Sequence, residues 1–253
     1  MGDGLSLEAL GVHLAPREWP LLYPGVWPAE SGVLDGGRLL PFDASDGALL
    51  AGRTPVLAVG SNACPGQLRH KMAESGIGSP VPLVRCRVTG LGVGVSAHVS
   101  VMGYVSASPF HAPGAVRELF VTWFDARQLA VIDASETAYD RAWVPGPEVR
   151  VEPEAGEPLP GAFVYVNRHG VLHDGAGEPR EHPGQRPLLT ELLAESAGLR
   201  DLFGATPEEF VSNARAKRAL CEQGTRLFAR EGRVTASGLE RHVREARPNL
   251  AAE

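Results

Sequence analysis

The strongest pattern in the chain is Pro55-Val-Leu-Ala-Val-Gly-Ser-Asn-Ala-Cys-Pro-Gly-Gln-Leu-Arg-His-Lys-Met72. Apolar residues 56–59 run into Gly60-Ser61-Asn62, and a helical pattern opens at Pro65. This order predicts a buried strand, a tight turn of small residues and the start of a helix. Such a turn can offer unpaired backbone N–H groups to a carboxylate or to a developing oxyanion.

Composition narrows the class of protein. With 253 residues, 43% hydrophobic and 21% charged, the chain has the balance of a folded globular protein. A net charge of −6 gives no electrostatic reason to expect a nucleic acid or an anionic membrane as partner. The sequence shows no signal peptide and no apolar run near the roughly 20 residues that span a bilayer. We therefore expect a soluble, cytoplasmic protein that binds neither nucleic acid nor membrane.

The middle of the chain, 55–170, carries many short strand-like segments with few helices. One helix is predicted over 125–133, with Asp125 as its N-cap. Turn residues separate the predicted strands, which are 81–89, 91–96, 99–106, 118–124, 138–144, 149–152 and 161–166. This pattern predicts an α+β domain built on a small mixed β-barrel, closed or half-closed.

Two extensions flank this domain. Residues 1–54 are rich in proline, glycine and tryptophan, which predicts an extended arm lying on the domain. Residues 171–253 begin with a polar loop, 171–186, and continue as helices predicted over 188–202 and 207–230. Thr206-Pro-Glu-Glu209 fits a capping box with proline at the first helical position. The apolar set of these helices is too small for an independent core, so we expect them to pack on the barrel.

Two motifs in the chain, one at residues 58–62 and one at residues 133–141, resemble those of a known family. Ala58-Val59-Gly60-Ser61-Asn62 resembles the loop of the γ-glutamylcyclotransferase-like family, which often reads Ala-Tyr-Gly-Ser-Asn. In that family a short helix ends near an Asp, followed by a Glu, an aromatic residue and a basic residue. Here the positions that resemble them are Asp133, Glu136, Tyr139 and Arg141. The resemblance covers residues 55–167, and two positions differ from the family's usual pattern: Val59 replaces Tyr and Thr137 replaces Gly.

The resemblance implies a fold, a site and a reaction. The fold is the family's β-barrel, with Glu136 as catalytic acid/base and with Val59, Gly60, Ser61, Asn62 and Tyr139 binding the substrate. The substrate is a small γ-glutamyl compound whose own amine attacks its γ-carbonyl, releasing 5-oxoproline and an amine. Because the nucleophile is intramolecular, positioning supplies much of the acceleration, and neither a metal nor a cofactor is expected. A half-buried Glu with a raised pKa could perform both proton transfers.

Other interpretations of the same residues stay open. Gly60-Ser61-Asn62 can be an ordinary turn in which Asn62 caps the helix, and Glu136 can be a solvated carboxylate. The pocket could also bind a ligand without catalysis, as in a regulatory protein. Tyr139 and Arg141 fit a structural role better than a catalytic one.

The cysteines and histidines offer a further alternative. Cys64 lies at the helix start, where a thiol pKa can fall, so a Cys64-dependent hydrolase or transferase is a lesser alternative, with His98 or His111 as its base. The three cysteines, Cys64, Cys86 and Cys221, contain no Cys-x-x-Cys pair, which argues against disulfides and zinc. His169, His173, Asp174 and His182 match no metal-binding spacing, and we interpret them as a polar loop.

Overall fold

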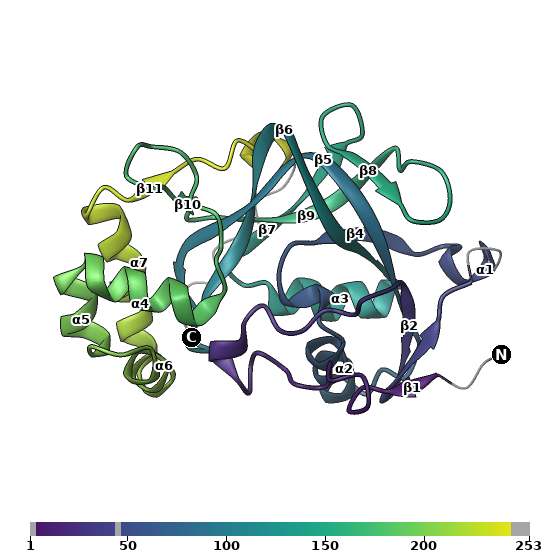
Figure 1. Cartoon of the computed structure of the whole chain (residues 1–253), viewed down its shortest axis with the longest axis horizontal. Coiled ribbons are helices and arrows are strands. Elements are labelled where there is room, and N and C mark those ends of the chain that lie inside the picture. The colour runs from purple at the N-terminus through teal and green to yellow at the C-terminus, as the bar shows by residue number, and fades with distance from the viewer. Residues whose placement is uncertain (1–3, 44–46, 244–253) are drawn as a thin grey trace.

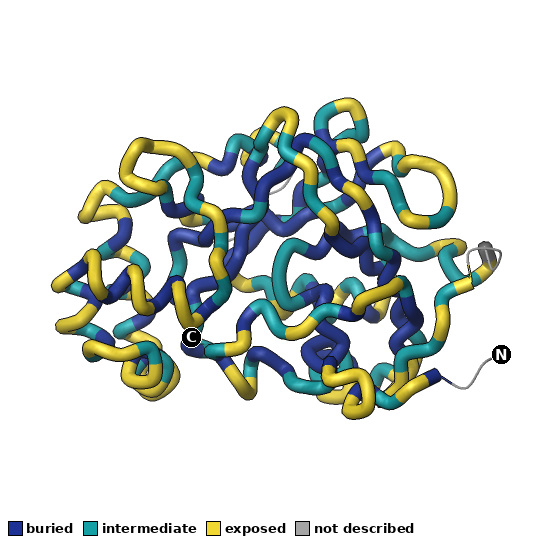
Figure 2. Tube along the Cα trace, in the orientation of Figure 1, coloured by how far each residue is buried: buried dark blue, intermediate teal, exposed yellow. Residues whose placement is uncertain are grey.

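In the computed structural model, a curved sheet carries helices on one side and a helical bundle at one end (Figure 1). The structure describes residues 4–43 and 47–243. Helices α2 (Pro65–Glu74) and α3 (Ala126–Ser135) lie next to each other beneath the sheet. Figure 2 shows the most deeply buried segments where the sheet meets these helices and where the bundle meets the sheet.

A long antiparallel hairpin forms the centre of the sheet. Its strands are β5 (Val81–Val99) and β6 (Val105–Phe124). The strand order is β1-β3-β2-β5-β6-β4-β9-β7, with β8 and β10 paired to β5 and β11 to β10. Only the β4–β9 pair is parallel within the described residues. The other strands are β1 (Leu5–Ser6), β2 (Gly32–Asp35), β3 (Arg38–Pro41), β4 (Thr54–Ala58), β7 (Tyr139–Pro145), β8 (Arg150–Pro153), β9 (Gly161–Asn167), β10 (Val171–Leu172) and β11 (Val234–Thr235).

The hairpin corrects the predicted strand boundaries. Segments 81–89 and 91–96 form one strand, because Gly90 makes an irregularity in the ladder and not a turn. Gly90 has a φ of +98°, and a Cβ there would clash with the Glu148 carbonyl oxygen. The predicted strand 99–106 is wrong, since residues 100–104 form the hairpin turn. The return strand expected over 118–124 is the end of the long strand β6.

The sheet is open, so the predicted closed or half-closed barrel is not what the structure shows. The ends of the strand order, β1 and β7, do not pair with each other among the described residues. Apolar side chains from several strands of the curved sheet pack together in one buried cluster, which includes Val88 on β5, Val144 on β7, Val151 on β8 and Val164 on β9. The mixture of helices with a mostly antiparallel sheet agrees with the predicted α+β class.

Several local predictions are confirmed. Strand β4, the short helix η2 (Ser61–Ala63) and α2 follow one another as strand, turn and helix. Asp125 caps α3 through a capping box with Gln128, and Thr206 caps α6 (Pro207–Ala216) through one with Glu209. Strands β7, β8 and β9 lie within two residues of their predicted bounds.

The two predicted C-terminal helices are each divided. Ser196 ends α4 (Gln185–Glu195) and caps α5 (Ala197–Phe203). Lys217 separates α6 from α7 (Arg218–Arg230). The predicted polar loop 171–186 also contains β10 and the first residues of α4. The remaining short helices are η1 (Pro20–Leu22), α1 (Gly47–Leu50) and η3 (Glu240–His242).

The C-terminal helices share a core with the tip of the hairpin. Val95 and Val99 of β5 and Val105 of β6 belong to the same buried cluster as Leu188 and Phe203 of the helices. The Val99 N–H also donates to Thr225 Oγ1 at 3.0 Å. The helices therefore support the turn between β5 and β6.

The N-terminal arm joins the sheet as well as covering it. Its strands β2 and β3 extend the sheet beside β5. Trp27 packs edge-on against Phe120, with ring centroids 6.2 Å apart, whereas Trp19 is 56% exposed. No helix in the described part of the chain is long and apolar enough to cross a membrane.

A core substitution tests whether helices and sheet unfold together. Phe203 is fully buried and its ring centroid lies 4.4 Å from that of Phe210. Phe203→Ala should lower the free energy of unfolding by about 3–5 kcal/mol because it leaves a cavity. Tryptophan fluorescence reports only on residues 19–143, where every tryptophan lies. In urea, fluorescence and far-ultraviolet circular dichroism should shift together.

The exposed Val116→Ala is the control and should change stability by less than about 0.5 kcal/mol. A fluorescence transition that stays in place in Phe203→Ala, while the dichroism transition moves, would show that the helices form a separate unit.

Candidate functional site

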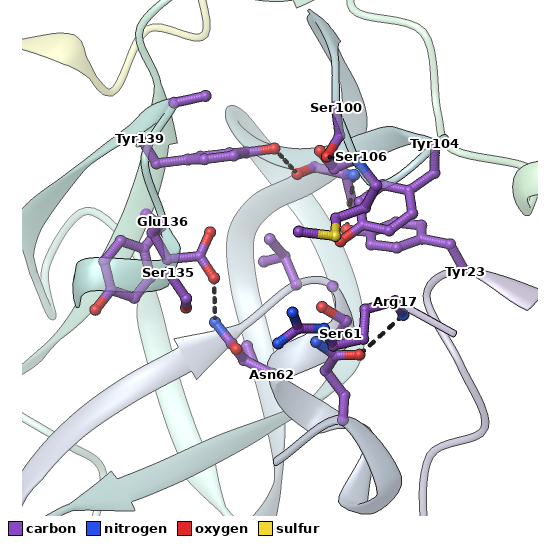
Figure 3. Close-up of a pocket in the computed structure, with 18 of the residues that line it drawn as sticks. Arg17, Tyr23, Ser61, Asn62, Ser100, Tyr104, Ser106, Ser135, Glu136 and Tyr139 are labelled. Atoms are coloured by element: carbon purple, nitrogen blue, oxygen red, sulfur yellow. Dashed lines mark hydrogen bonds between the residues drawn. The ribbon is translucent and has the colours of Figure 1, made fainter. Parts of the chain in front are cut away.

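A cavity of about 130 Å³ lies where four parts of the fold meet (Figure 3). These are the loop between β4 and α2, the C-terminal end of α3, the turn between β5 and β6, and the N-terminal arm. The cavity has room for several water molecules or part of a small polar ligand. Its lining mixes tyrosine, serine and charged side chains.

The predicted substrate-binding residues and the predicted catalytic residue meet at this cavity. Val59, Gly60, Ser61, Asn62 and Tyr139 all line it. So does Glu136, which is 74 residues from Asn62 in the sequence. The structure therefore brings the two sequence motifs together.

Glu136 lies at the end of α3 and points back toward the loop after β4 (Figure 3). It forms the C-cap of the helix, and its N–H donates to the Ile132 and Asp133 carbonyl oxygens. Its Oε1 accepts a hydrogen bond from Asn62 Nδ2 at 3.0 Å. The side chain is only 17% exposed, so the solvated-carboxylate interpretation does not fit the structure.

The Asn62 side chain is hydrogen-bonded to Glu136 and Lys71 and does not cap α2. It is 8% exposed, and its Oδ1 accepts a hydrogen bond from Lys71 Nζ at 2.9 Å. The N-cap of α2 is Cys64, and no side chain caps the helix there. The amide therefore links a carboxylate on one side to an ammonium on the other.

Lys71 is the charge that sequence reasoning missed. Its Nζ lies 3.3 Å from Glu136 Oε1, and the side chain is 8% exposed. A signal was present, because Lys71 follows Leu68 by three residues and precedes Met72 on the buried face of α2. A lysine at that position is costly unless it has a partner, and Glu136 and Asn62 provide one.

Three tyrosines form another wall of the cavity. The Tyr139 hydroxyl donates to the Ala107 carbonyl oxygen at 2.9 Å, and the Ala107 N–H donates to the Tyr23 hydroxyl at 2.9 Å. Burial raises the pKa of Tyr139 to about 12 and also raises the pKa of Tyr23 and Tyr104. These hydroxyls therefore stay protonated near neutral pH and act as hydrogen-bonding groups.

Asp133, Tyr165 and Arg141 anchor the end of α3. Asp133 Oδ1 accepts a hydrogen bond from the Tyr165 hydroxyl at 2.7 Å, and its Oδ2 lies 3.3 Å from Arg141 Nη1. Burial, followed by this hydrogen bond, raises the pKa of Tyr165. The guanidinium also lies over the Phe163 ring, 4.9 Å from its centroid. Arg141 therefore ties α3 to β7 and β9 and supports the position of Glu136.

The histidines do not gather into a metal site. His98 lines the cavity and stacks on His169, with ring centroids 5.4 Å apart. Burial lowers the pKa of His98 to about 4, so its ring is neutral near pH 7. His111 lies away from the cavity, with Nε2 3.8 Å from Glu148 Oε1. Among the described residues, no group of three or more His, Cys, Asp or Glu could hold a metal ion.

Cys64 lies behind the loop and outside the lining. It is fully buried, its Sγ donates to the Leu14 carbonyl oxygen at 3.4 Å, and burial raises the pKa of its thiol. Among the described residues, the lining that contains His98 includes no cysteine, and His111 lies outside the lining. An activated cysteine is partly exposed and has a lowered thiol pKa, whereas Cys64 is buried and its pKa is raised.

The N-terminal arm completes the site, which sequence reasoning did not anticipate. Tyr23 stacks on Tyr104 with ring centroids 4.6 Å apart, and its hydroxyl approaches Gly60 so closely that a Cβ there would clash. Because the φ of Gly60 is −143°, its backbone does not need the left-handed conformation that favours glycine. The position requires glycine because a side chain would collide with the Tyr23 hydroxyl. Arg17 also lines the cavity. No local pattern marks either residue, because their partners are far away in the sequence.

Comparison with known proteins adds no identification. No protein-family model matches the chain, and no curated protein matches it significantly. The functional argument therefore depends on the geometry of the cavity.

Replacing the buried lysine tests the charge network. Lys71→Met keeps most of the side-chain volume but removes the ammonium that pairs with Glu136 and donates to Asn62 Oδ1, so the buried carboxylate loses its counter-charge. The free energy of unfolding at pH 7 should fall by about 3 kcal/mol, measured by urea denaturation. Lys217, the other lysine of the chain, is exposed, and Lys217→Met is the matched control. A Lys71→Met variant as stable as that control would contradict the network.

Proposed function

We propose that this protein is a cyclotransferase that acts on a small γ-glutamyl compound and releases 5-oxoproline, with Glu136 as general acid/base. The observation that carries the proposal is the position of Glu136: a largely desolvated carboxylate hydrogen-bonded to Asn62 of the loop after β4. The resemblance of both motifs to the γ-glutamylcyclotransferase-like family supports the same reaction. The expected partner is the small-molecule substrate.

The reaction needs proton transfers and positioning but no redox step. The free α-amine forms a bond to its own γ-carbonyl carbon, and the bond from that carbon to the leaving nitrogen breaks. The proton lost by the attacking amine passes to Glu136 and then to the leaving nitrogen, so the enzyme is regenerated. General acid–base catalysis of this kind contributes typically about 10²–10⁴-fold. The residues that line the cavity would contribute by orienting the substrate.

The side chains around Glu136 suit this role. Oε1 is engaged by Asn62 and Lys71, whereas Oε2 has no hydrogen-bond partner among the described residues. Oε2 is thus the oxygen that can receive and return a proton. Ser61 and Asn62 begin the short helix η2, where N–H groups lack a partner within the helix. Those N–H groups are candidates for binding the substrate or the oxyanion.

Two alternatives use the same observations differently. A non-catalytic binding or regulatory protein could hold a charged ligand at Lys71 and Glu136 without turnover. The low exposure of Glu136 and its hydrogen bond to the loop favour the enzyme. The Cys64-dependent alternative is disfavoured by the burial of that thiol and the raised pKa that results.

The first test concerns Glu136. A screen of γ-glutamyl compounds for 5-oxoproline release identifies the substrate, and Glu136→Gln is then compared with wild type. Turnover should fall by about 10²-fold or more while ligand affinity stays within a few-fold, because Gln keeps the hydrogen bonds and cannot carry the proton.

The exposed Glu118→Gln on β6 is the control and should keep full turnover. Full turnover in Glu136→Gln would reject the mechanism. Ligand binding with no 5-oxoproline from wild type would favour the binding protein instead.

The second test concerns Cys64. Cys64→Ala should retain turnover within a few-fold, because the thiol is buried outside the cavity and the attacking amine belongs to the substrate. Steady-state kinetics measure the effect, and mass spectrometry checks for a covalent adduct. Complete loss of activity, together with a thioester trapped in wild type, would support the cysteine mechanism.

A further inference from the structure

A cation from the N-terminal arm faces the cavity from the side opposite to Glu136. Arg17 lines the cavity, and Figure 3 shows Arg17 and Tyr23 across from Glu136. The Arg17 side chain is 27% exposed, whereas that of Lys71 is 8% exposed. Arg17 therefore lies nearer the rim of the cavity and Lys71 deeper inside.

The arm is fixed where it passes over α2. The Gly66 N–H donates to the Val12 carbonyl oxygen at 3.0 Å. The Arg17 N–H donates at 3.1 Å to Oε1 of Gln67, a side chain that is 3% exposed. Because the backbone of Arg17 is held by a buried group, the Cα from which its side chain extends to the cavity is positioned before any ligand arrives.

The guanidinium is only partly occupied. Its Nη1 pairs with Glu74 Oε2 at 2.5 Å, while Nε and Nη2 have no partner among the described residues. Glu74 is 53% exposed and lies outside the lining, so this ion pair is weakened by solvent. A carboxylate can therefore bind to the remaining N–H groups in the geometry that guanidinium favours.

The charge of the lining also favours an anion. Its charged side chains near pH 7 are Arg17, Lys71 and Glu136, since the low pKa of His98 keeps that ring neutral. Lys71 and Glu136 pair with each other, whereas the counter-ion of Arg17, Glu74, lies outside the lining, so the lining itself carries one more positive than negative charge. A negatively charged group of a ligand at the rim would offset this excess from inside the cavity.

We propose that Arg17 forms a subsite for a carboxylate on the expelled amine, so that the substrates are γ-glutamyl amino acids or peptides rather than γ-glutamylamines. This inference rests on the proposed function. Ring closure requires the glutamyl half to lie against Glu136, which places the expelled half toward the rim. Arg17 is the cation found there, and a pocket of about 130 Å³ leaves that half partly outside.

The test compares two ligands that differ mainly by one carboxylate, γ-glutamylalanine and γ-glutamylethylamide. Calorimetric titrations use the Glu136→Gln background, in which turnover of both compounds should be about 10²-fold slower or more. They share the glutamyl half, so the effect of that substitution on it cancels in the ratio of affinities. The ratio should favour γ-glutamylalanine by about tenfold or more, as a charge-assisted hydrogen bond predicts.

Adding Arg17→Gln should reduce the ratio to within about twofold, and Arg17→Lys should restore part of it. Arg69→Gln is the matched control: Arg69 contacts Glu8 and the His13 carbonyl oxygen of the arm, lies outside the lining, and should leave the ratio unchanged. Circular dichroism verifies that each variant is folded.

A ratio that survives Arg17→Gln, a ratio near one at the outset, or failure to bind either compound would overturn the subsite. Arg17-dependent binding without 5-oxoproline release by wild type would support the subsite while contradicting the proposed function. Equal kcat/KM for the two compounds in wild type would keep the function and overturn the subsite.

Discussion

The antiparallel pairing of β5 with β6 is the interaction on which the rest of the structure depends. The hairpin contributes to each of the three buried clusters: Leu83 and Phe120 to the one over α2 and α3, Val88 and Leu119 to the one inside the curved sheet, and Val99 to the one under the C-terminal helices. One pair of long strands thus joins parts of the molecule that would otherwise be small separate cores. Because small cores are only marginally stable, the C-terminal helices depend on the apolar side chains of the hairpin to stay packed against the sheet.

The same pairing determines where the site can form. The hairpin places Ala107 between Tyr23 and Tyr139, and its turn carries Tyr104 to the cavity. Burying the Glu136 carboxylate and the Lys71 ammonium has a large desolvation cost, which their mutual contact and the Asn62 amide offset. In this arrangement each of the three groups contacts the other two, and Glu136 Oε2 has no hydrogen-bond partner among the described residues.

The sequence predicted well where the signal was local. The strand, turn and helix over residues 55–72 and the capping boxes at Asp125 and Thr206 follow from neighbouring residues, and the structure confirms them. It predicted poorly where the outcome depended on pairing. Gly90 was interpreted as a break although the ladder continues past it, and the barrel was expected although the sheet remains open. Each of these outcomes depends on strands far away in the chain.

The sequence by itself determined the α+β class, the loop at Gly60-Ser61-Asn62 and the helix capped by Asp125, which was predicted over 125–133 and extends to Ser135. Caps, turns and apolar periodicity act within a few residues, so they can be recognised without the fold. Only the tertiary structure decided that Lys71 pairs with Glu136 and that Tyr23 and Arg17 of the arm line the same cavity. The buried face of α2 indicates that Lys71 is buried, but its ion-pair partner Glu136 lies 65 residues away. Tyr23 and Arg17 have no local signature, because the groups that hold them lie 84 and 50 residues away in the sequence. The energy of each contact depends on the exclusion of water by the whole fold.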